Sequence, residues 1–353
     1  MMIIFRAFAF IFCLFALQAC SPSEKERMTI AELTKDMTTH CFGRHLIDMP
    51  KSFNQLKMDG PSTAFGPKGV DFQKAPKMEI EILEENVSFQ QFSQAVEKRL
   101  SELKAERPAY EKKRSLFSFV QKISTEEILI RWQEGDAPDG YFFSEIHLYR
   151  GKSHGVVNAS SYDNGFVATE KWLADFAKTV VAFDPSSTSQ KGFCVGPLVL
   201  TGSYEREIVL GLAFRSKKQP DVFFTIDTNT FGEGPEQTLL QRVNSPKNLL
   251  NVFDISFNTL RKGELKVAGL KAQEVLVSFK GSDDEGKATK EQKLLLETMR
   301  EKPSPLEPLM TIRMVTGQQD PDGVRHTSSL TDTEVTGVWD AIIKSIRLRP
   351  GAV

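Results

Sequence analysis

The chain alternates between two kinds of hydrophobic pattern. Apolar residues occupy every second position over 78–82 and again over 128–132, which is typical of strands with one buried face. Between them, Phe89–Leu103 carries apolar residues at helical spacing and is followed by Pro108. This spacing predicts a helix with one apolar face that ends before the proline.

The same reading predicts further elements along the chain. Strands are expected at 141–149, 154–160, 208–214, 222–226, 264–268 and 274–279, and helices at 236–252, interrupted near Pro246, and at 287–302. Residues 150–152 form a candidate tight turn between two of these strands. Because strands mostly follow strands, the pattern favours an α+β fold with antiparallel sheets over an alternating βαβ fold.

Two halves of the chain share one order of features. Cys41-Phe-Gly43 opens the first half, and Cys194-Val-Gly196 opens the second. Each half closes with an amphipathic helix that carries a tryptophan, then a short strand-like segment and a proline. We therefore predict two similar domains, 38–187 and 188–353, each an antiparallel sheet packed with helices. The polar segment 185–192 is the predicted hinge.

The N-terminus is typical of an export signal. Arg6 precedes an apolar run that ends in Leu17-Gln-Ala-Cys20, and this run is shorter than the roughly 20 residues of a membrane-spanning helix. Leu17-Gln-Ala-Cys20 resembles a bacterial lipobox, in which cleavage precedes the cysteine. We expect a signal peptide at 1–19, lipidation of Cys20 and a lipidated tether over 20–37. The protein would then be periplasmic and lipid-anchored, and Ser21 favours the outer membrane.

Two cysteines remain for the folded protein after export. Cys13 leaves with the signal peptide and Cys20 takes lipid, so Cys41 and Cys194 are left. The oxidising periplasm favours a disulfide between them. The alternative is two buried free thiols that act as small apolar side chains.

Composition excludes some classes of protein. Lys plus Arg is 45 and Asp plus Glu is 46, a net charge of −1, so the basic excess of a nucleic-acid-binding protein is missing. The 26 phenylalanines supply material for a sizeable core, which argues against disorder.

The search for catalytic and cofactor motifs finds no convincing match. The sequence has no Gly-x-Ser-x-Gly elbow, P-loop or His-Glu-x-x-His motif, and no cofactor is expected. The densest reactive cluster is 40–45, where Cys41 with His40 or His45 could form a nucleophilic pair. Asp283-Asp-Glu285 lacks the ligand spacing of a calcium loop and reads as a solvated turn.

The combination of motifs resembles a known family. Cys41-Phe-Gly-Arg-His-Leu-Ile-Asp-Met-Pro50 is similar to the N-terminal domain of the type VI secretion lipase-immunity proteins of the fourth class. Phe193-Cys-Val-Gly196, Val267-Ala-Gly-Leu270 followed by Glu274, and Val338-Trp-Asp-Ala-Ile-Ile-Lys-Ser-Ile-Arg-Leu-Arg-Pro350 are similar to its C-terminal domain. Lys271-Ala-Gln departs from the family, which more often has a glycine before this glutamate.

The resemblance implies a two-domain α+β protein that is not an enzyme. It would bind and neutralise a cognate phospholipase effector in the periplasm. The expected lipid anchor would attach it to the membrane, and the charge balance predicts no nucleic-acid partner. Segments 59–75 and 281–308 differ in length between the halves and are candidate effector contacts. The alternative function is a general envelope lipoprotein that binds a small ligand or an assembly partner.

The tryptophans Trp172 and Trp339 are expected to pack into the core.

Overall fold

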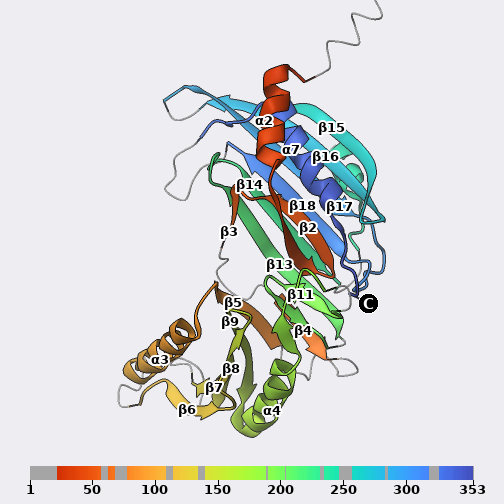
Figure 1. Ribbon diagram of the computed structural model, residues 1–353. Coiled ribbons are helices and arrows are strands. Elements are labelled where there is room, and N and C mark those ends of the chain that lie inside the picture. Colours follow the sequence, from red (N-terminus) through yellow and green to blue (C-terminus); the bar gives the residue numbers. More distant parts are fainter. Residues whose placement is uncertain are drawn as a thin grey trace, which may run out of the picture.

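The computed structural model describes most of the chain (Figure 1). The described residues are 22–56, 63–67, 78–108, 114–133, 140–187, 190–202, 204–230, 234–245, 257–282, 285–317 and 326–352. Helices pack on antiparallel sheets throughout these residues, which confirms the predicted α+β class. Within them, no helix is long and apolar enough to cross a membrane.

The first half of the chain begins with a helix and a hairpin. Its elements are α2 (Glu24–Thr34), β1 (Met37–Gly43), β2 (His45–Pro50), β3 (Phe53–Leu56), β4 (Thr63–Pro67), β5 (Met78–Glu85), α3 (Phe89–Ala105), β6 (Phe117–Lys122), β7 (Glu127–Trp132), β8 (Tyr141–Arg150), β9 (Ser153–Tyr162), the 3₁₀ turn η2 (Asp163–Gly165), α4 (Phe166–Ala177) and β10 (Val180–Ala182). The predicted turn at 150–152 connects β8 to β9, with Gly151 in a left-handed conformation.

The second half repeats this order without the initial helix and with one strand, β13, in place of β3 and β4. Its elements are β11 (Phe193–Val195), β12 (Leu198–Leu200), β13 (Tyr204–Ser216), β14 (Phe223–Asn229), α5 (Leu239–Asn244), β15 (Phe257–Val267), β16 (Leu270–Ser282), β17 (Ala288–Thr298), β18 (Leu309–Thr316), α7 (Asp332–Ser345) and β19 (Arg347–Leu348). The expected boundary at 187 and 188 falls between β10 and β11.

The larger sheet makes the internal repeat visible. Its strand order is β15-β16-β17-β18-β14-β13-β4-β5-β9-β8-β7-β6, with β3 also paired to β13. From the middle outward, the first half runs β4-β5-β9-β8-β7-β6 and the second runs β13-β14-β18-β17-β16-β15. These two series have the same connectivity along the chain. A helix follows β5 and β14, and another follows β9 and β18. The two halves meet edge to edge where β4 pairs with β13.

The second, six-stranded sheet exchanges hairpins between the halves. Its order is β10-β12-β11-β1-β2-β19. The hairpin β1–β2 of the first half pairs with β19 of the second half, and β11–β12 of the second half pairs with β10 of the first. The strands β1 and β11 pair antiparallel at the centre, where Gly43 lies opposite Cys194. Each half therefore completes the sheet of the other.

The same exchange composes the two main cores. One core combines Phe42, Ile47 and Met49 of the first hairpin with Trp339 and Ile342 of α7. The other core combines residues of β11 and β12 with α4 and the strands of the first half; its members from the two sides include Phe193, Leu198, Leu173 and Phe176. Neither core is built from one half alone, so burial of apolar surface couples the stability of the two halves.

The N-terminal polar segment differs from the expected tether. Residues 24–34 of the segment 20–37 form helix α2, which begins with a capping box between Ser23 and Glu26. Figure 1 shows α2 lying beside α7. Leu33 of α2 joins the larger core, so this stretch is part of the folded body rather than an extended spacer.

Two helix predictions need correction. Residues 287–302 were predicted as a charged helix, but 288–298 form strand β17, paired with β16 on one side and β18 on the other. The consecutive leucines 294–296 hide an alternation in which Leu294 and Leu296 are buried and Leu295 is less so. In place of the helix predicted at 236–252, the structure has a short helix, Leu239–Asn244, and 246–252 lie outside the described residues.

Candidate functional site

The reactive cluster at 40–45 lies in the β1–β2 hairpin. Cys41 is disulfide-bonded to Cys194 of β11, with their Cα atoms 5.6 Å apart. Because this bond consumes the thiol, Cys41 has no thiolate to act as a nucleophile. The interpretation as a hydrolase that uses Cys41 is therefore wrong for this oxidised structure.

The two histidines of this cluster are also held by packing. Burial, followed by the nearby charge of Arg44, lowers the pKa of His45 to about 4. His40 contacts the ring of Phe214 edge-on, with centroids 4.9 Å apart, and burial lowers its pKa. Among the described side chains, no three His, Cys, Asp or Glu residues are placed to hold a metal ion.

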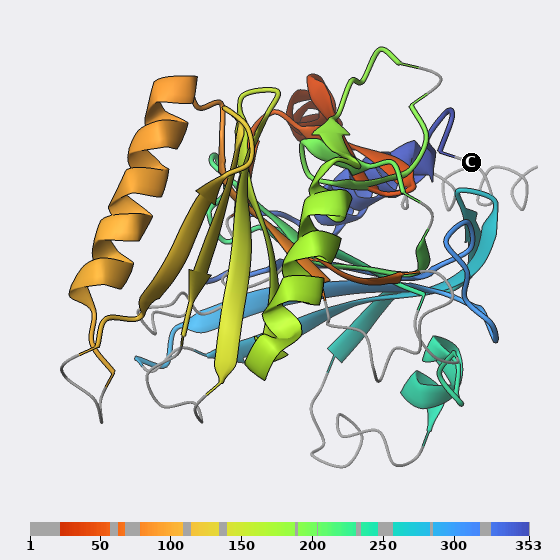
Figure 2. The ribbon, with the colours of Figure 1, turned by 90° about the horizontal axis from the view of Figure 1, so that it is seen from below.

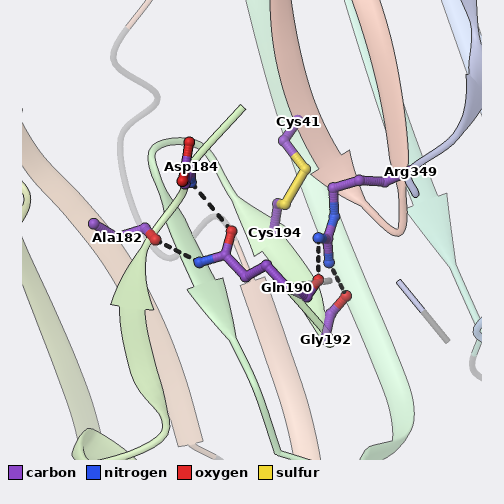
Figure 3. Close-up of a disulfide and its surroundings, with 7 residues drawn as sticks. All are labelled: Cys41, Ala182, Asp184, Gln190, Gly192, Cys194 and Arg349. Atoms are coloured by element: carbon purple, nitrogen blue, oxygen red, sulfur yellow. Dashed lines mark hydrogen bonds between the residues drawn. A yellow bond between two sulfur atoms is a disulfide. The ribbon is translucent and has the colours of Figure 1, made fainter. Parts of the chain in front are cut away.

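A junction of hydrogen bonds fastens the linker between the halves (Figure 3). The Nη2 of Arg349 donates to the carbonyl oxygen of Gly192 at 2.5 Å, and its Nη1 donates to the carbonyl oxygen of Gln190. The Nε2 of Gln190 donates to the carbonyl oxygen of Ala182 at 2.6 Å. Arg349 is 2% exposed. The C-terminal segment thus holds the linker beside the disulfide, which restricts the predicted hinge.

A buried polar network lies between α3 and the first half of the large sheet. Arg99 of α3 donates from Nε and Nη2 to the two carboxylate oxygens of Glu145, at 2.9 and 3.2 Å. Trp132 donates from Nε1 to Glu145 at 3.2 Å, and His147 contacts the same carboxylate at 3.2 Å. The other ring nitrogen of His147 lies 2.8 Å from His154.

The charge of Glu145 is strongly favoured in this network. Burial raises its pKa, but hydrogen bonds from His147 and Arg99 and their positive charges outweigh burial and lower the pKa to about 2. The second half has an equivalent ion pair, in which Arg242 of α5 donates to both oxygens of Glu297 at 2.7 and 2.6 Å. An arginine thus joins α3 to β8 in the first half, and another joins α5 to β17 in the second.

The final helix of each half, α4 or α7, lies on the other face of the large sheet and is also held by ion pairs. Arg131 of β7 lies 3.4 Å from Glu170 of α4, and Arg261 of β15 pairs with Asp340 of α7 and with Glu274. Figure 2 shows α3 and α4 on opposite sides of the first-half strands. Sequence reasoning missed these pairs because no local motif marks them. Except for Arg261 and Glu274, their members are 39 or more positions apart in the chain.

The two tryptophans differ in burial. Trp339 is 0% exposed and donates from Nε1 to Glu274 at 3.1 Å, which confirms its predicted role in the core. Trp172 lies on the flank of α4 and is 37% exposed, so the prediction that it packs into the core is wrong.

An aromatic surface flanks the outer strand of the first half. The guanidinium of Arg131 lies 3.8 Å from the ring centroid of Phe166 and 4.9 Å from that of Phe119. Phe166 also contacts Phe142 at an angle of 67°. Phe119 and the neighbouring Val120 are each 38% exposed. Phe119 and Val120 thus form an exposed apolar surface, beneath which Arg131 is largely buried and paired with Glu170.

A pocket of about 550 Å³ lies beside α5 in the second half. Its lining includes Thr238, Leu239, Glu297, Met299, Arg300 and Lys302. Carboxylates and cations alternate around it, and Glu297 is already paired with Arg242. One carboxylate of this lining is thus held in an ion pair with α5.

The segments expected to contact the effector are only partly described. Within 59–75, the structure describes 63–67, which form β4 inside the sheet. Within 281–308, most residues belong to β17 and to the connection that follows it. Cys20 and the predicted signal peptide at 1–19, as well as Asp283 and Asp284, lie outside the described residues. Lipidation of Cys20 therefore stays a prediction.

The comparisons with known proteins agree with this fold. Residues 187–351 match the family model for the Tle cognate immunity protein 4 C-terminal domain. No curated protein matches the chain.

Solved structures cover both halves of the chain. The apo immunity protein TplEi of the type VI secretion system from Pseudomonas aeruginosa is 20% identical, with a TM-score of 0.64 over 90% of this chain and 98% of that one. A chain of the Tle4–Tli4 complex matches at 20% identity and a TM-score of 0.64, over 90% of this chain and 99% of that one. TplEi bound to an "L" peptide matches at 22% identity, with a TM-score of 0.59 over 89% of this chain and 98% of that one.

The resemblance that the sequence motifs suggested is thereby confirmed at the level of family and fold. Residues 187–351 match the model of the Tle cognate immunity protein 4 C-terminal domain, and the described body has the fold of the TplEi and Tli4 immunity proteins.

Proposed function

We propose that this protein is a periplasmic immunity protein that binds and neutralises a cognate phospholipase effector of type VI secretion. The family match over residues 187–351 carries the proposal. The protein acts by binding and is not an enzyme. This chain shares the fold of one chain of the solved Tle4–Tli4 complex, and that complex supports direct binding of the effector as the means of protection.

The rigid connection of the two halves supports a binding role. The hairpin exchange, the Cys41–Cys194 disulfide and the hydrogen bond from Gln190 to Ala182 all cross between the halves. A preformed surface loses less conformational entropy when it binds a partner than a mobile surface does. The effector would therefore meet both halves in one fixed arrangement.

The sequence features at the N-terminus support a periplasmic, lipid-anchored location. The lipobox-like segment ends at Cys20, and the folded body begins a few residues later at α2. A disulfide between Cys41 and Cys194 suits an oxidising compartment. The anchor would hold the inhibitor beside the phospholipids that the effector attacks. The predicted membrane for this anchor is the outer membrane.

Co-expression with the lipase encoded beside its gene tests the function. Residues 21–353 are produced with this lipase, and phospholipase activity and co-purification are measured. Loss of activity together with a stable complex supports immunity. An active lipase that forms no complex contradicts it for that partner, and a general envelope lipoprotein would then be the better interpretation.

The location is tested separately in cells that make the full chain. Labelled palmitate should enter the wild-type protein and not the Cys20→Ser variant, which should also leave the membrane fraction. Cys41→Ser is the matched control, because it removes a cysteine without touching the lipobox. Equal labelling of wild type and Cys20→Ser would contradict the anchor.

A further inference from the structure

The two ends of the large sheet are equivalent by the internal repeat but differ in chemistry. The outermost strands are β6 in the first half and β15 in the second. In the part of the chain that the structure describes, no strand pairs with the outer side of either one. β15 carries exposed Lys262, Glu264 and Lys266, the kind of charged edge that discourages pairing with another strand.

Strand β6 has no such charged series. Its sequence is Phe-Ser-Phe-Val-Gln-Lys, and five of its six residues are exposed. Phe119 and Val120, at its middle, are large apolar side chains that are each 38% exposed. A bulge lies between Phe117 and Phe119, and regular pairing with β7 continues from Phe119 to Lys122. An apolar edge strand of this kind is a template for an added strand.

A lysine lies near each end of this edge. The Nζ of Lys104 lies 5.1 Å from the ring centroid of Phe117, and the guanidinium of Arg131 lies over Phe119. Lys122 is exposed at the end of the strand. Among the described residues, neither Lys104 nor Lys122 has a carboxylate within ion-pair distance, whereas Arg131 is balanced by Glu170. The edge is therefore complementary to a segment that combines apolar and acidic side chains.

We propose that the outer edge of β6 is a docking site for an extended apolar and acidic segment of the effector, which adds to the large sheet as a strand. Main-chain hydrogen bonds from β6 would supply affinity. Phe119 and Val120, which lie on opposite faces of the strand, would contact alternate side chains of the bound segment. This proposal rests on the proposed function, since it names where the effector binds.

The test compares matched substitutions at the two ends of the sheet. Val120→Glu places a negative charge on β6, and Thr259→Glu places the same charge at an exposed position of β15. Affinity for the purified effector is measured by titration calorimetry. Val120→Glu should bind about tenfold or more weakly, as expected for a contact that contributes strongly to an interface. Thr259→Glu should bind within about twofold of the wild type.

Hydrogen exchange provides a readout that needs no substitution. On formation of the wild-type complex, amides of Phe119–Lys122 should exchange more slowly, whereas those of β15 should be unchanged. Thermal melting verifies that both variants are folded. Equal affinity of Val120→Glu together with unprotected β6 amides would overturn the docking site, while the immunity function would stand. If the wild-type chain binds no effector, the proposed function itself fails.

A second copy of this chain is the competing occupant of the edge. Sedimentation of the free protein should give a monomer at micromolar concentration. A dimer that Val120→Glu dissociates would show that β6 pairs with β6 of another copy, and that result would overturn the proposal.

Discussion

Cys41 and Cys194 are 153 residues apart in the chain, yet their disulfide joins β1 and β11 at the centre of the six-stranded sheet. Each cysteine opens one half of the internal repeat, and each belongs to the hairpin that its half contributes to the other. The covalent bond thus closes the exchange at the point where the two hairpins meet.

Removal of this disulfide should lower stability without changing the fold. Closure of so long a loop gives an upper limit of about 5 kcal/mol in the chain-entropy model, and measured losses are typically 2–5 kcal/mol. We expect Cys41→Ser, Cys194→Ser and the double variant to lose the same free energy of unfolding in urea. The wild type in reducing agent is the control and should match them. A double variant much less stable than either single one would contradict a simple cross-link.

The exchanged hairpins predict that the halves cannot fold separately. We expect fragments 22–187 and 188–353, expressed alone, to lack a cooperative thermal transition, because each lacks the hairpin that completes its core. Co-expressed, they should co-purify in a 1:1 ratio and melt cooperatively. A Cys41→Ser version of the first fragment tests whether association needs the covalent bond. A single fragment that melts like the full chain would show that the exchange is dispensable.

Glu145 should make stability depend on acid pH. Its pKa is lowered from 4.5 to about 2 in the folded protein. The carboxylate therefore stabilises the fold at pH values above its unfolded pKa, and this contribution disappears as the pH falls from about 5 toward 2. At about 1.4 kcal/mol per pKa unit, it amounts to about 3 kcal/mol.

The Glu145→Gln variant tests this dependence by urea unfolding between pH 3 and pH 7. It should be less stable than the wild type at pH 7, and the difference should shrink as the pH falls. A constant difference across this range would show that the carboxylate charge is not what stabilises the network.

Gly337 of α7 should control the docking of α2. A Cβ atom at this position would lie 2.5 Å from Cδ1 of Ile30, so a larger side chain must push α2 away. We expect Gly337→Val to expose the segment 22–36 to limited proteolysis at concentrations that leave the wild type intact. Lys344→Val is the control, because Lys344 is exposed on the same helix. Equal cleavage of the two variants would contradict the close approach.

Local chemistry determined the separate elements of this protein. The alternation at 78–82 and 128–132, the apolar face of 89–103 and the turn at 150–152 all form as the sequence predicts. These features need only neighbouring residues, because one face of a strand or helix must be apolar to be buried. The repeated Cys-x-Gly openings and tryptophan helices likewise identified two equivalent halves.

Tertiary structure decided how these elements combine. Residues 288–298 form a strand because they pair with β16 on one side and β18 on the other, although many of these residues favour helices. The Arg99–Glu145 and Arg242–Glu297 pairs join residues 46 and 55 positions apart. The exchange of hairpins leaves no mark in the pattern of either half, because a hairpin shows the same apolar face whichever core buries it. The pairing of β2 with β19 and of β12 with β10, together with the burial of Phe42 beside α7 and of Phe193 beside α4, distinguishes the exchange from two separate domains.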